Sequence, residues 1–408
     1  MEFNTLDEAE VEAKTVILRI DINTPLDRDT HQILDLTRIK NAVPTIKELV
    51  GKGAKVVILA HQGRKGSRDF TSLEQHAEAL SECSGIKIRF TPDLMGEKVI
   101  SAIRSMRVGD VLLLDNVRGW DGETLKLSPE EHSKSELVRK LAPLAQLYVN
   151  DAFAAAHRSQ CSLVGFAPLL PSYAGRLMEK ELKTLSKITT NPAKPFIMLL
   201  GGAKFSEVPT VIERMLALEL ADKVIVGGLP AHAFYKAKGV LLGAPTERSL
   251  QREGSPEVYE EIKRVFDKYE AQIHLPIDFG GEINGKREEL RVDELPTNLP
   301  LLDIGTQSIN EFKEVIAQAK TVFVSGPMGV SENPNFMKGT KELFTAIVHS
   351  DAFSLVGGAH TIAAVKKLNL QDKISYISTG GGALEKYMIG KPLPAVEALK
   401  EAKKRMES

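Results

Sequence analysis

The chain has 408 residues, which is too many for one ordinary hydrophobic core, so its length favours two domains. Hydrophobic residues make up 43% and charged residues 26%, as in soluble globular proteins, and a net charge of −1 gives no general attraction to nucleic acid or to an anionic membrane. Cys83 and Cys161 form no CxxC pair, the N-terminus is acidic and polar, and no apolar run approaches the roughly 20 residues that span a bilayer, so we expect a cytoplasmic protein.

Short aliphatic runs alternate with helical stretches along the whole chain. The first half predicts strands at Val16–Ile20, Val56–Leu59, Val111–Leu114 and Leu147–Asn150. The second half predicts strands at Phe196–Leu200, Val224–Val226, Gln272–Leu275, Val322–Val324, Phe353–Val356 and Ile374–Ser378. Continuous apolar strands that alternate with helices indicate parallel sheets covered by helices on both faces. The fold class is therefore α/β, and this architecture occurs twice.

The segment Tyr173–Lys187 favours a helix and is followed by the turn-rich sequence TTNPAKP, which predicts a domain junction. We expect a first domain at residues 1–172, a connecting hinge helix at 173–190 and a second domain at 191–390. The segment Gly390–Pro394 interrupts the last helical pattern. That break would allow a C-terminal segment at 391–408 to return to the first domain.

In the first half, cationic side chains follow the predicted strands. In open α/β sheets, ligands bind at the carboxyl ends of the strands. Arginine donates two parallel hydrogen bonds to phosphate or carboxylate, so a substrate with at least two negative charges is indicated. Any one of these residues alone would be read as a surface arginine or a structural histidine, but the set as a whole favours an anion site. The residues concerned are Arg38, His61, Arg64, Arg118, His157 and Arg158, with Asp21 and Asn23 on the first exit loop.

In the second half, the predicted strands are followed by glycine pairs. Glycine allows backbone N–H groups to approach a phosphate closely, so five such turns indicate a nucleotide-sized site. Lys204 follows one of them and is suited to a phosphoryl group in transfer. The turns are Gly201–Lys204, Gly227–Pro230, Ser325–Gly329, Gly357–Thr361 and Thr379–Ala383. The sequence contains no GxxxxGK[ST] segment and no GxGxxG, which argues against a P-loop enzyme and a dinucleotide-binding dehydrogenase.

Eight strings in order resemble the phosphoglycerate kinase family over essentially the whole chain: RIDINTPLD, AHQGR, NDAFAAAHR, EKELK, GGAK, LPIDF, GPMGV and STGGGA. Several details are similar to the archaeal branch of this family. The resemblance implies two Rossmann-like domains and reversible phosphoryl transfer between 1,3-bisphosphoglycerate and ADP, giving 3-phosphoglycerate and ATP. It also implies Mg²⁺ as the magnesium nucleotide, no nucleic-acid or membrane partner, and a monomer or homodimer.

The resemblance assigns roles to residues of both halves. In the first half, Asp21, Asn23, His61 and His157 would bind the triose, while Arg64, Arg118 and Arg158 would hold the 3-phosphate and Arg38 would reach the transferring group. In the second half, Lys204, Gly380 and Gly381 would act on the transferring phosphoryl group. The implied nucleotide-binding residues are Gly202, Lys204, Gly227, Gly228, Gly305, Pro327, Glu332, Gly357, Gly358, Ala359, His360 and Thr361.

The chain departs from the family pattern at several positions. Val208 replaces a lysine, Ser325 replaces an asparagine and Ser331 replaces a phenylalanine. His360 stands where the family has a metal-associated aspartate, which leaves the protein ligand of magnesium open. These changes keep a second hypothesis in view, namely a non-catalytic nucleotide-binding descendant of the same fold.

The expected chemistry needs no general base, because a substrate carboxylate with a pKa near 3.5 is already ionised at neutral pH. Catalysis would depend on alignment and on neutralising charge during in-line transfer. Arg38 and Lys204 lie in different predicted domains, so we expect hinge closure about the connecting helix to bring them together. An oxidoreductase that binds NAD is a further alternative, which the missing fingerprint disfavours.

Overall fold

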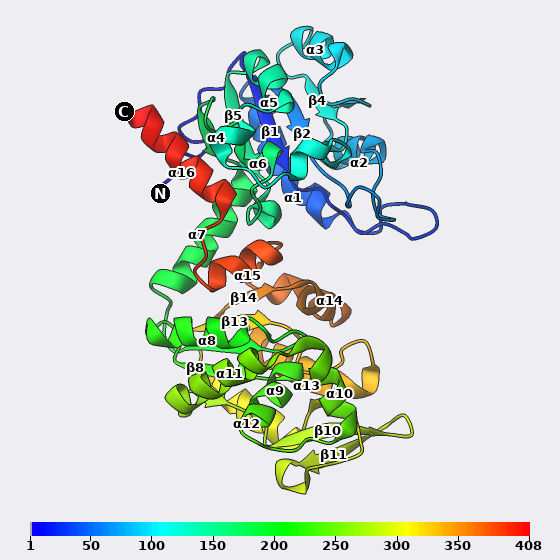
Figure 1. The fold of residues 1–408 in the computed structure, drawn as a ribbon, viewed down its shortest axis with the longest axis vertical. Coiled ribbons are helices and arrows are strands. Elements are labelled where there is room, and N and C mark those ends of the chain that lie inside the picture. The colour runs from blue at the N-terminus through cyan, green and yellow to red at the C-terminus, as the bar shows by residue number, and fades with distance from the viewer. Residues whose placement is uncertain (1) are drawn as a thin grey trace. The chain divides into compact units, whose positions relative to one another are not determined.

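The computed structural model describes residues 2–408 and divides them into two compact units (Figure 1). Unit 1 contains the described residues up to Lys183 together with Lys391–Ser408, and unit 2 contains Thr184–Gly390. The boundary falls within helix α7 (Arg176–Thr190). The predicted connecting helix began too early, because Ser172–Ala174 form strand β6, which pairs with β5.

Unit 1 is built on a six-stranded parallel sheet with the order β3-β4-β2-β1-β5-β6. The central strands β1, β2 and β4 are short and mainly apolar, as expected where both faces of a parallel sheet are buried. Strand β3 was not predicted, because its alternating sequence IRFT lacks a continuous apolar run. The strands are β1 (Thr15–Ile20), β2 (Lys55–Leu59), β3 (Ile88–Thr91), β4 (Val111–Leu114), β5 (Leu147–Asp151) and β6.

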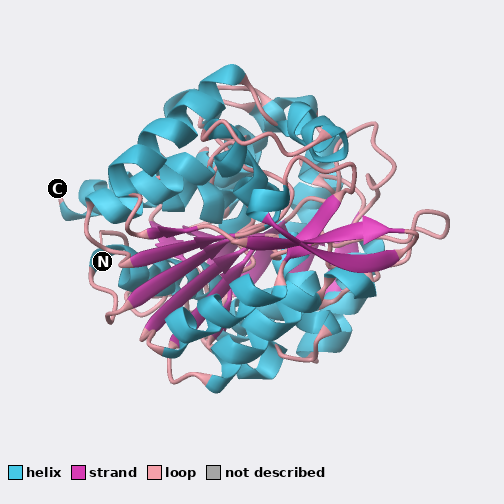
Figure 2. Cartoon of the chain, turned by 90° about the horizontal axis from the view of Figure 1, so that it is seen from below, coloured by secondary structure: helices cyan, strands magenta, loops and turns pink. Residues whose placement is uncertain are grey.

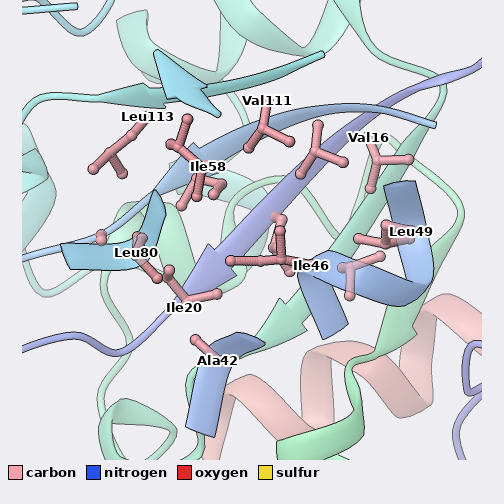
Figure 3. Close-up of a cluster of buried hydrophobic side chains, with 14 of the residues drawn as sticks. Val16, Ile20, Ala42, Ile46, Leu49, Ile58, Leu80, Val111 and Leu113 are labelled. Atoms are coloured by element: carbon pink, nitrogen blue, oxygen red, sulfur yellow. The ribbon is translucent and has the colours of Figure 1, made fainter. Parts of the chain in front are cut away.

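Alternate residues of these strands supply two cores, one on each face of the unit 1 sheet. Val16, Ile20 and Ile58 pack with residues of helices α1 (Thr37–Gly51) and α2 (Glu74–Ser84), as Figure 3 shows. Ile17 and Val57 point to the other face and join a cluster with helices α3 (Glu97–Arg104) and α5 (Glu136–Leu141). The sheet is therefore held rigidly between two helical layers.

Unit 2 contains a second six-stranded parallel sheet with the order β15-β14-β13-β7-β8-β9. Figure 2 shows helices on both sides of the strands. Its strands are β7 (Phe196–Leu200), β8 (Lys223–Val226), β9 (Ile273–His274), β13 (Thr321–Ser325), β14 (Phe353–Gly357) and β15 (Tyr376–Ile377). Its helices are α8 (Val208–Ala217), α9 (Gly228–Ala237), α10 (Ala244–Glu253), α11 (Pro256–Tyr269), α12 (Thr306–Ala317), α13 (Lys338–His349), α14 (Ala359–Lys367) and α15 (Gly382–Met388).

A small antiparallel sheet, which the sequence analysis did not predict, also belongs to unit 2. It has the order β11-β10-β12, with β10 at Asp278–Ile283, β11 at Lys286–Arg291 and β12 at Leu301–Ile304. The two-residue turn Asn284–Gly285 joins β10 to β11, and both residues have positive φ, as a type I′ hairpin turn requires. The Asn-Gly pair is typical of such a hairpin turn. The strand β11 that follows is mostly charged and lacks the apolar residues by which the other strands were predicted.

Helix α16 (Pro394–Glu407) packs within unit 1 although it follows unit 2 in the chain. The backbone N–H of Ala395 donates to the carbonyl of Ala156 at 3.1 Å, and Lys400 pairs with Glu2 at 2.7 Å. The short helices α4 (Pro129–His132) and α6 (Cys161–Val164) lie in the same unit. In the part of the chain that the structure describes, no helix has the length and apolar character to cross a membrane.

Candidate active site

The loops that follow β1, β2, β4 and β5 gather the cationic side chains of unit 1 at one edge of its sheet. These four strands are neighbours in the order β4-β2-β1-β5 and run parallel, so their carboxyl ends share that edge. The Asn23 side chain joins two of the loops, because its Oδ1 accepts a hydrogen bond from the backbone N–H of Gly63 at 2.9 Å. The fold thus brings charged side chains that are far apart in the sequence to one edge of the sheet.

Asp21 and Arg38 form an ion pair at this edge, with 3.1 Å between Arg38 Nη1 and Asp21 Oδ2. Burial alone would raise the pKa of Asp21, but the charge of Arg38 and a hydrogen bond from the Asn23 backbone lower it to about 2. Arg38 is the second residue of α1, where a cation opposes the helix dipole. Asp21 offsets part of that conflict, and the Arg38 side chain keeps 30% of its surface exposed.

Arg118 is buried beside these residues in a short 3-10 turn, Val117–Gly119. Its guanidinium donates to the carbonyl of Gly63, and its backbone N–H donates to Asn116 Oδ1 at 3.1 Å. Burial, followed by the charge of Arg158, lowers the pKa of Arg118 to about 10, so the side chain is still a cation at neutral pH. A buried arginine beside other arginines favours an anionic ligand.

Arg158 is half-buried after β5, and its pKa is lowered by burial and by the charges of Arg64, Arg19 and Arg38, while Asp21 raises it. Arg158 therefore shares its electrostatic environment with the other exit loops. His157 precedes it and is also half-buried. Arg64 is exposed, and its backbone N–H donates to Ser67 Oγ at 3.0 Å.

A buried network beneath this edge, which the sequence pattern does not predict, involves Arg19, Glu123 and Ser162. Arg19 is fully buried and donates from Nε to Ser162 Oγ at 2.8 Å, and Ser162 Oγ in turn donates to Glu123 Oε1 at 2.7 Å. Arg19 Nη2 lies 3.0 Å from Nδ1 of His61. Because arginine only donates, Nδ1 accepts and the proton of a neutral His61 ring resides on Nε2. Burial in this cluster lowers the pKa of His61 well below its usual value.

In unit 2, the glycine turns after β7, β8 and β13 lie against one another. The N–H of Gly202 donates to the carbonyl of Pro327 at 2.7 Å, and the N–H of Gly228 donates to the carbonyl of Met328 at 2.9 Å. A Cβ added to Gly326, where φ is +95°, would lie 2.2 Å from the backbone of Gly201. This close approach is what requires glycine, and it packs three strand ends together.

A cavity of about 310 Å³ opens beside these turns. Its walls include Gly202, Gly228 and Pro327 from the predicted nucleotide-binding set, with Glu332 and His360. The volume and the mainly apolar walls suit a small organic ligand. The other lining residues are Ala203, Leu229, His232, Pro245, Thr246, Ser249, Phe279, Pro300, Leu301, Leu302, Asp303, Ile304, Met328, Gly329 and Val330.

Most of these further lining residues were missed by the sequence analysis. Most of those missed come from α9, the first turns of α10, and strands β10 and β12. Ala203, Leu229, Met328 and Gly329, in contrast, lie in the glycine turns that the sequence indicated. The pattern of residues after strand ends does not predict those missed, because most of them lie within helices or strands. The small antiparallel sheet that supplies several of them was itself not predicted. Periodicity gives one signal, since Gly228 and His232 lie four residues apart and therefore share one face of α9.

Other predicted residues of the nucleotide set do not line this cavity. Gly305 is the N-cap of α12, and a Cβ there would lie 2.1 Å from the Asp278 carboxyl group, so its need for glycine is explained by packing. Thr361 is buried and its Oγ1 accepts a hydrogen bond from the N–H of Gly326 at 2.7 Å. Gly357, Gly358 and Ala359 form the turn into α14, and Gly227 precedes α9.

Lys204 lines a second cavity of about 260 Å³, together with Glu207, Val208 and Glu385. Its side chain is exposed, and its charge lowers the pKa of Glu385, although burial raises that pKa overall. Gly380 and Gly381 immediately precede α15, and the N–H of Gly380 donates to Ser378 Oγ at 3.1 Å. Val208, in place of the expected lysine, is the first residue of α8.

The side chains around His360 offer few ligands for a metal ion. Nδ1 of His360 lies 3.4 Å from Glu332 Oε1, and both side chains are mostly exposed. Within residues 2–408, no three His, Cys, Asp or Glu side chains are grouped so that they could hold a metal ion. His360 and Glu332 therefore do not form a metal site of the protein among the described residues.

The fold is that of a two-unit α/β protein with a cationic edge on one sheet and a cavity lined by glycine turns on the other. The family model described as "Phosphoglycerate kinase" matches residues 6–391. The phosphoglycerate kinase of Methanothermus fervidus is 42% identical over 406 residues, covering 100% of this chain and 99% of that protein, and that of Methanopyrus kandleri is 43% identical, covering 97% of each.

Two solved structures agree with these sequence relationships. Phosphoglycerate kinase from Pyrococcus horikoshii OT3 has a TM-score of 0.90 at 37% identity, with 98% of this chain and 100% of that chain covered. The enzyme from Coxiella burnetii has a TM-score of 0.84 at 32% identity, with 98% and 99% covered. The chain belongs to the phosphoglycerate kinase family, and the predicted α/β fold with two parallel sheets is confirmed.

Proposed function

We propose that the chain catalyses reversible phosphoryl transfer between 1,3-bisphosphoglycerate and ADP, giving 3-phosphoglycerate and ATP. The observation that carries this proposal is the cationic edge of unit 1, where Arg38, Arg118 and Arg158 share one environment with the neutral ring of His61. A triose with two anionic ends suits this edge, whereas a neutral ligand would leave its charges uncompensated.

In the ATP-consuming direction, the nucleophile is the substrate carboxylate, which is ionised at neutral pH. The side chains therefore need to bind, orient and neutralise, and no general base is assigned. We place the 3-phosphate at Arg64, Arg118 and Arg158, with Asp21, Asn23, His61 and His157 around the triose. Arg38 would compensate the charge of the transferring group from the triose side.

On the nucleotide side, we place the ligand in the 310 Å³ cavity, with the glycine turns near its phosphates and Glu332 near its ribose. Lys204 and the N–H groups of Gly380 and Gly381 would face the transferring phosphoryl group. Mg²⁺ would accompany the nucleotide as the partner of its phosphates, which is how this ion usually enters such sites. We place the enzyme in the cytoplasm, as a monomer or homodimer.

The test is an assay of purified protein with 3-phosphoglycerate and magnesium ATP, with product formation coupled to NADH oxidation. Wild-type protein is expected to turn over at about 1–1000 per second. Arg38→Ala should lower kcat by about 10²–10³-fold, because one charge that stabilises the transition state is lost. Arg104→Ala changes an exposed arginine in the last turn of α3 and serves as the matched control.

Two results would contradict the proposal. Folded wild-type protein that binds nucleotide but shows no turnover would favour the non-catalytic descendant, and His360→Asp would be the next variant to assay. Equal activity of Arg38→Ala and Arg104→Ala would remove Arg38 from the site while leaving the reaction itself intact.

A further inference from the structure

Helix α9 places one buried polar side chain in the wall of the 310 Å³ cavity. His232 lies one turn after Gly228 and is 5% exposed. Its ring packs against Phe279 with 5.1 Å between the ring centroids and 56° between the planes. Packing of this kind fixes the ring, so its two nitrogens have defined positions.

Nδ1 of His232 is enclosed by protein and has no hydrogen-bond partner among residues 2–408. Burial lowers the pKa of this side chain to about 4, so the ring is neutral at physiological pH. A neutral imidazole has one N–H donor and one acceptor nitrogen. Burying an imidazole in an apolar wall is costly when its polar atoms lack partners, so a ligand that pairs with Nε2 would offset part of this cost.

Two neighbouring polar side chains of the cavity, Thr246 and Asp303, differ from His232 because they already contact protein groups. Thr246 Oγ1 accepts a hydrogen bond from the N–H of Leu301 at 3.4 Å. Asp303 pairs with Arg287 at 2.7 Å. His232 is thus available to a ligand at the place where the walls offer few other polar contacts.

The environment of the ring also selects its tautomer. Buried N–H groups without an acceptor are rarer in proteins than under-used acceptors, so the enclosed Nδ1 is the acceptor and Nε2 carries the proton. A ligand that pairs with this ring must therefore offer an acceptor. Purine bases carry such acceptors on their ring nitrogens and have an apolar face that suits the cavity walls.

We propose that His232 reads the base of the nucleotide by donating its Nε2–H to an acceptor nitrogen of a purine ring. The inference rests on the proposed function, because it assumes that this cavity takes the nucleotide. It adds a specificity-determining residue that lies within a helix and belongs to none of the glycine turns.

Binding of magnesium ADP and of its 1-deaza, 3-deaza and 7-deaza analogues, each lacking one acceptor nitrogen, would test this by calorimetry. In wild-type protein, one analogue should bind about 2- to 10-fold more weakly than ADP, the value of one hydrogen bond. His232→Leu should bind ADP and that analogue equally, whereas His232→Gln, which keeps an N–H donor, should restore the difference. His274→Leu, at a half-buried histidine on β9 outside the cavity lining, should behave as wild type.

A merely structural role for His232 would lower the affinity for every nucleotide by one common factor, and that result would overturn the proposal. Equal affinity of wild-type protein for ADP and all three analogues would overturn it as well, without affecting the proposed reaction. Absence of ADP binding to folded wild-type protein would instead overturn the nucleotide half of the proposed function, and this inference with it. The wild-type comparison needs no variant, so a poorly folding His232→Leu protein does not prevent the test.

Discussion

The candidate active site depends on residues that lie one layer below it. Arg19 contacts His61 on one side and, through Ser162, reaches Glu123 on the other. Glu123 is fully buried, and its pKa is raised by burial even though the charge of Arg19 lowers it. Removing one partner of a buried charged pair leaves the other uncompensated, so these two residues should act as a unit in stability.

We predict that Arg19→Leu lowers the free energy of unfolding of unit 1 by about 3–5 kcal/mol. The double variant Arg19→Leu/Glu123→Leu should lose clearly less than the sum of the two single changes, because neither charge is then left alone. Urea unfolding of the four proteins at pH 7 measures the coupling. Strictly additive losses would show that the network is not coupled.

At the scale of the element, helix α7 is tied to unit 1 through its first turn. Asp151, at the end of β5, is fully buried, and its Oδ1 accepts hydrogen bonds from the N–H groups of Leu177 at 2.8 Å and Met178 at 3.0 Å. The N–H of Arg176 donates to Thr45 Oγ1 at 2.9 Å. These contacts satisfy backbone donors that a helix start otherwise leaves unpaired.

We predict a pH-dependent stability from Asp151, whose pKa burial raises from 3.8 to about 7. Because the folded state holds this proton more tightly, stability falls as the pH rises from about 4 to 7 and is level above that. The loss is at most about 4 kcal/mol if the full shift is expressed. Asp151→Asn should lack this slope, so the difference in urea midpoint between the two proteins should move in favour of the variant from pH 5 to pH 8. A constant difference across this range would show that the carboxyl group does not titrate there.

Element by element, the sequence predicted the apolar strands well because each core strand is a short continuous run, as with Phe196–Leu200 and Val111–Leu114. The sequence did not predict β3, β6 or the sheet β11-β10-β12. These strands are charged or short and are stabilised by hydrogen bonds to neighbouring strands, which the local sequence does not reveal. The site was predictable where residues follow strand ends, as with Arg118. Arg19 and His232 were not predictable, because their importance depends on which distant groups surround them.

At the scale of the whole molecule, each unit carries its own sheet and core, and α7 belongs to both, with its residues up to Lys183 in unit 1 and those from Thr184 in unit 2. Arg38 belongs to unit 1 and Lys204 to unit 2. Phosphoryl transfer brings the triose and the nucleotide into contact, so we propose that bending at α7 closes the enzyme during each cycle.

We predict that small-angle scattering will show a smaller radius of gyration with 3-phosphoglycerate and magnesium ADP together than with either ligand alone. Arg38→Ala should compact less, because one of the charges that attract the transferring group is missing. The Arg104→Ala protein should match wild type. An unchanged radius with both ligands bound would exclude closure of any substantial amplitude.

The return of α16 to unit 1 also affects how the protein is made. Unit 2 is one continuous stretch of chain, so all of its residues are synthesised before Lys391. Most of unit 1 is synthesised first, but the unit is complete only when Lys391–Ser408 have been added. This segment then forms the hydrogen bond to Ala156 and the ion pair with Glu2. The first unit therefore receives its last segment only after every residue of the second has been synthesised, which differs from the usual order in which the N-terminal domain is finished first.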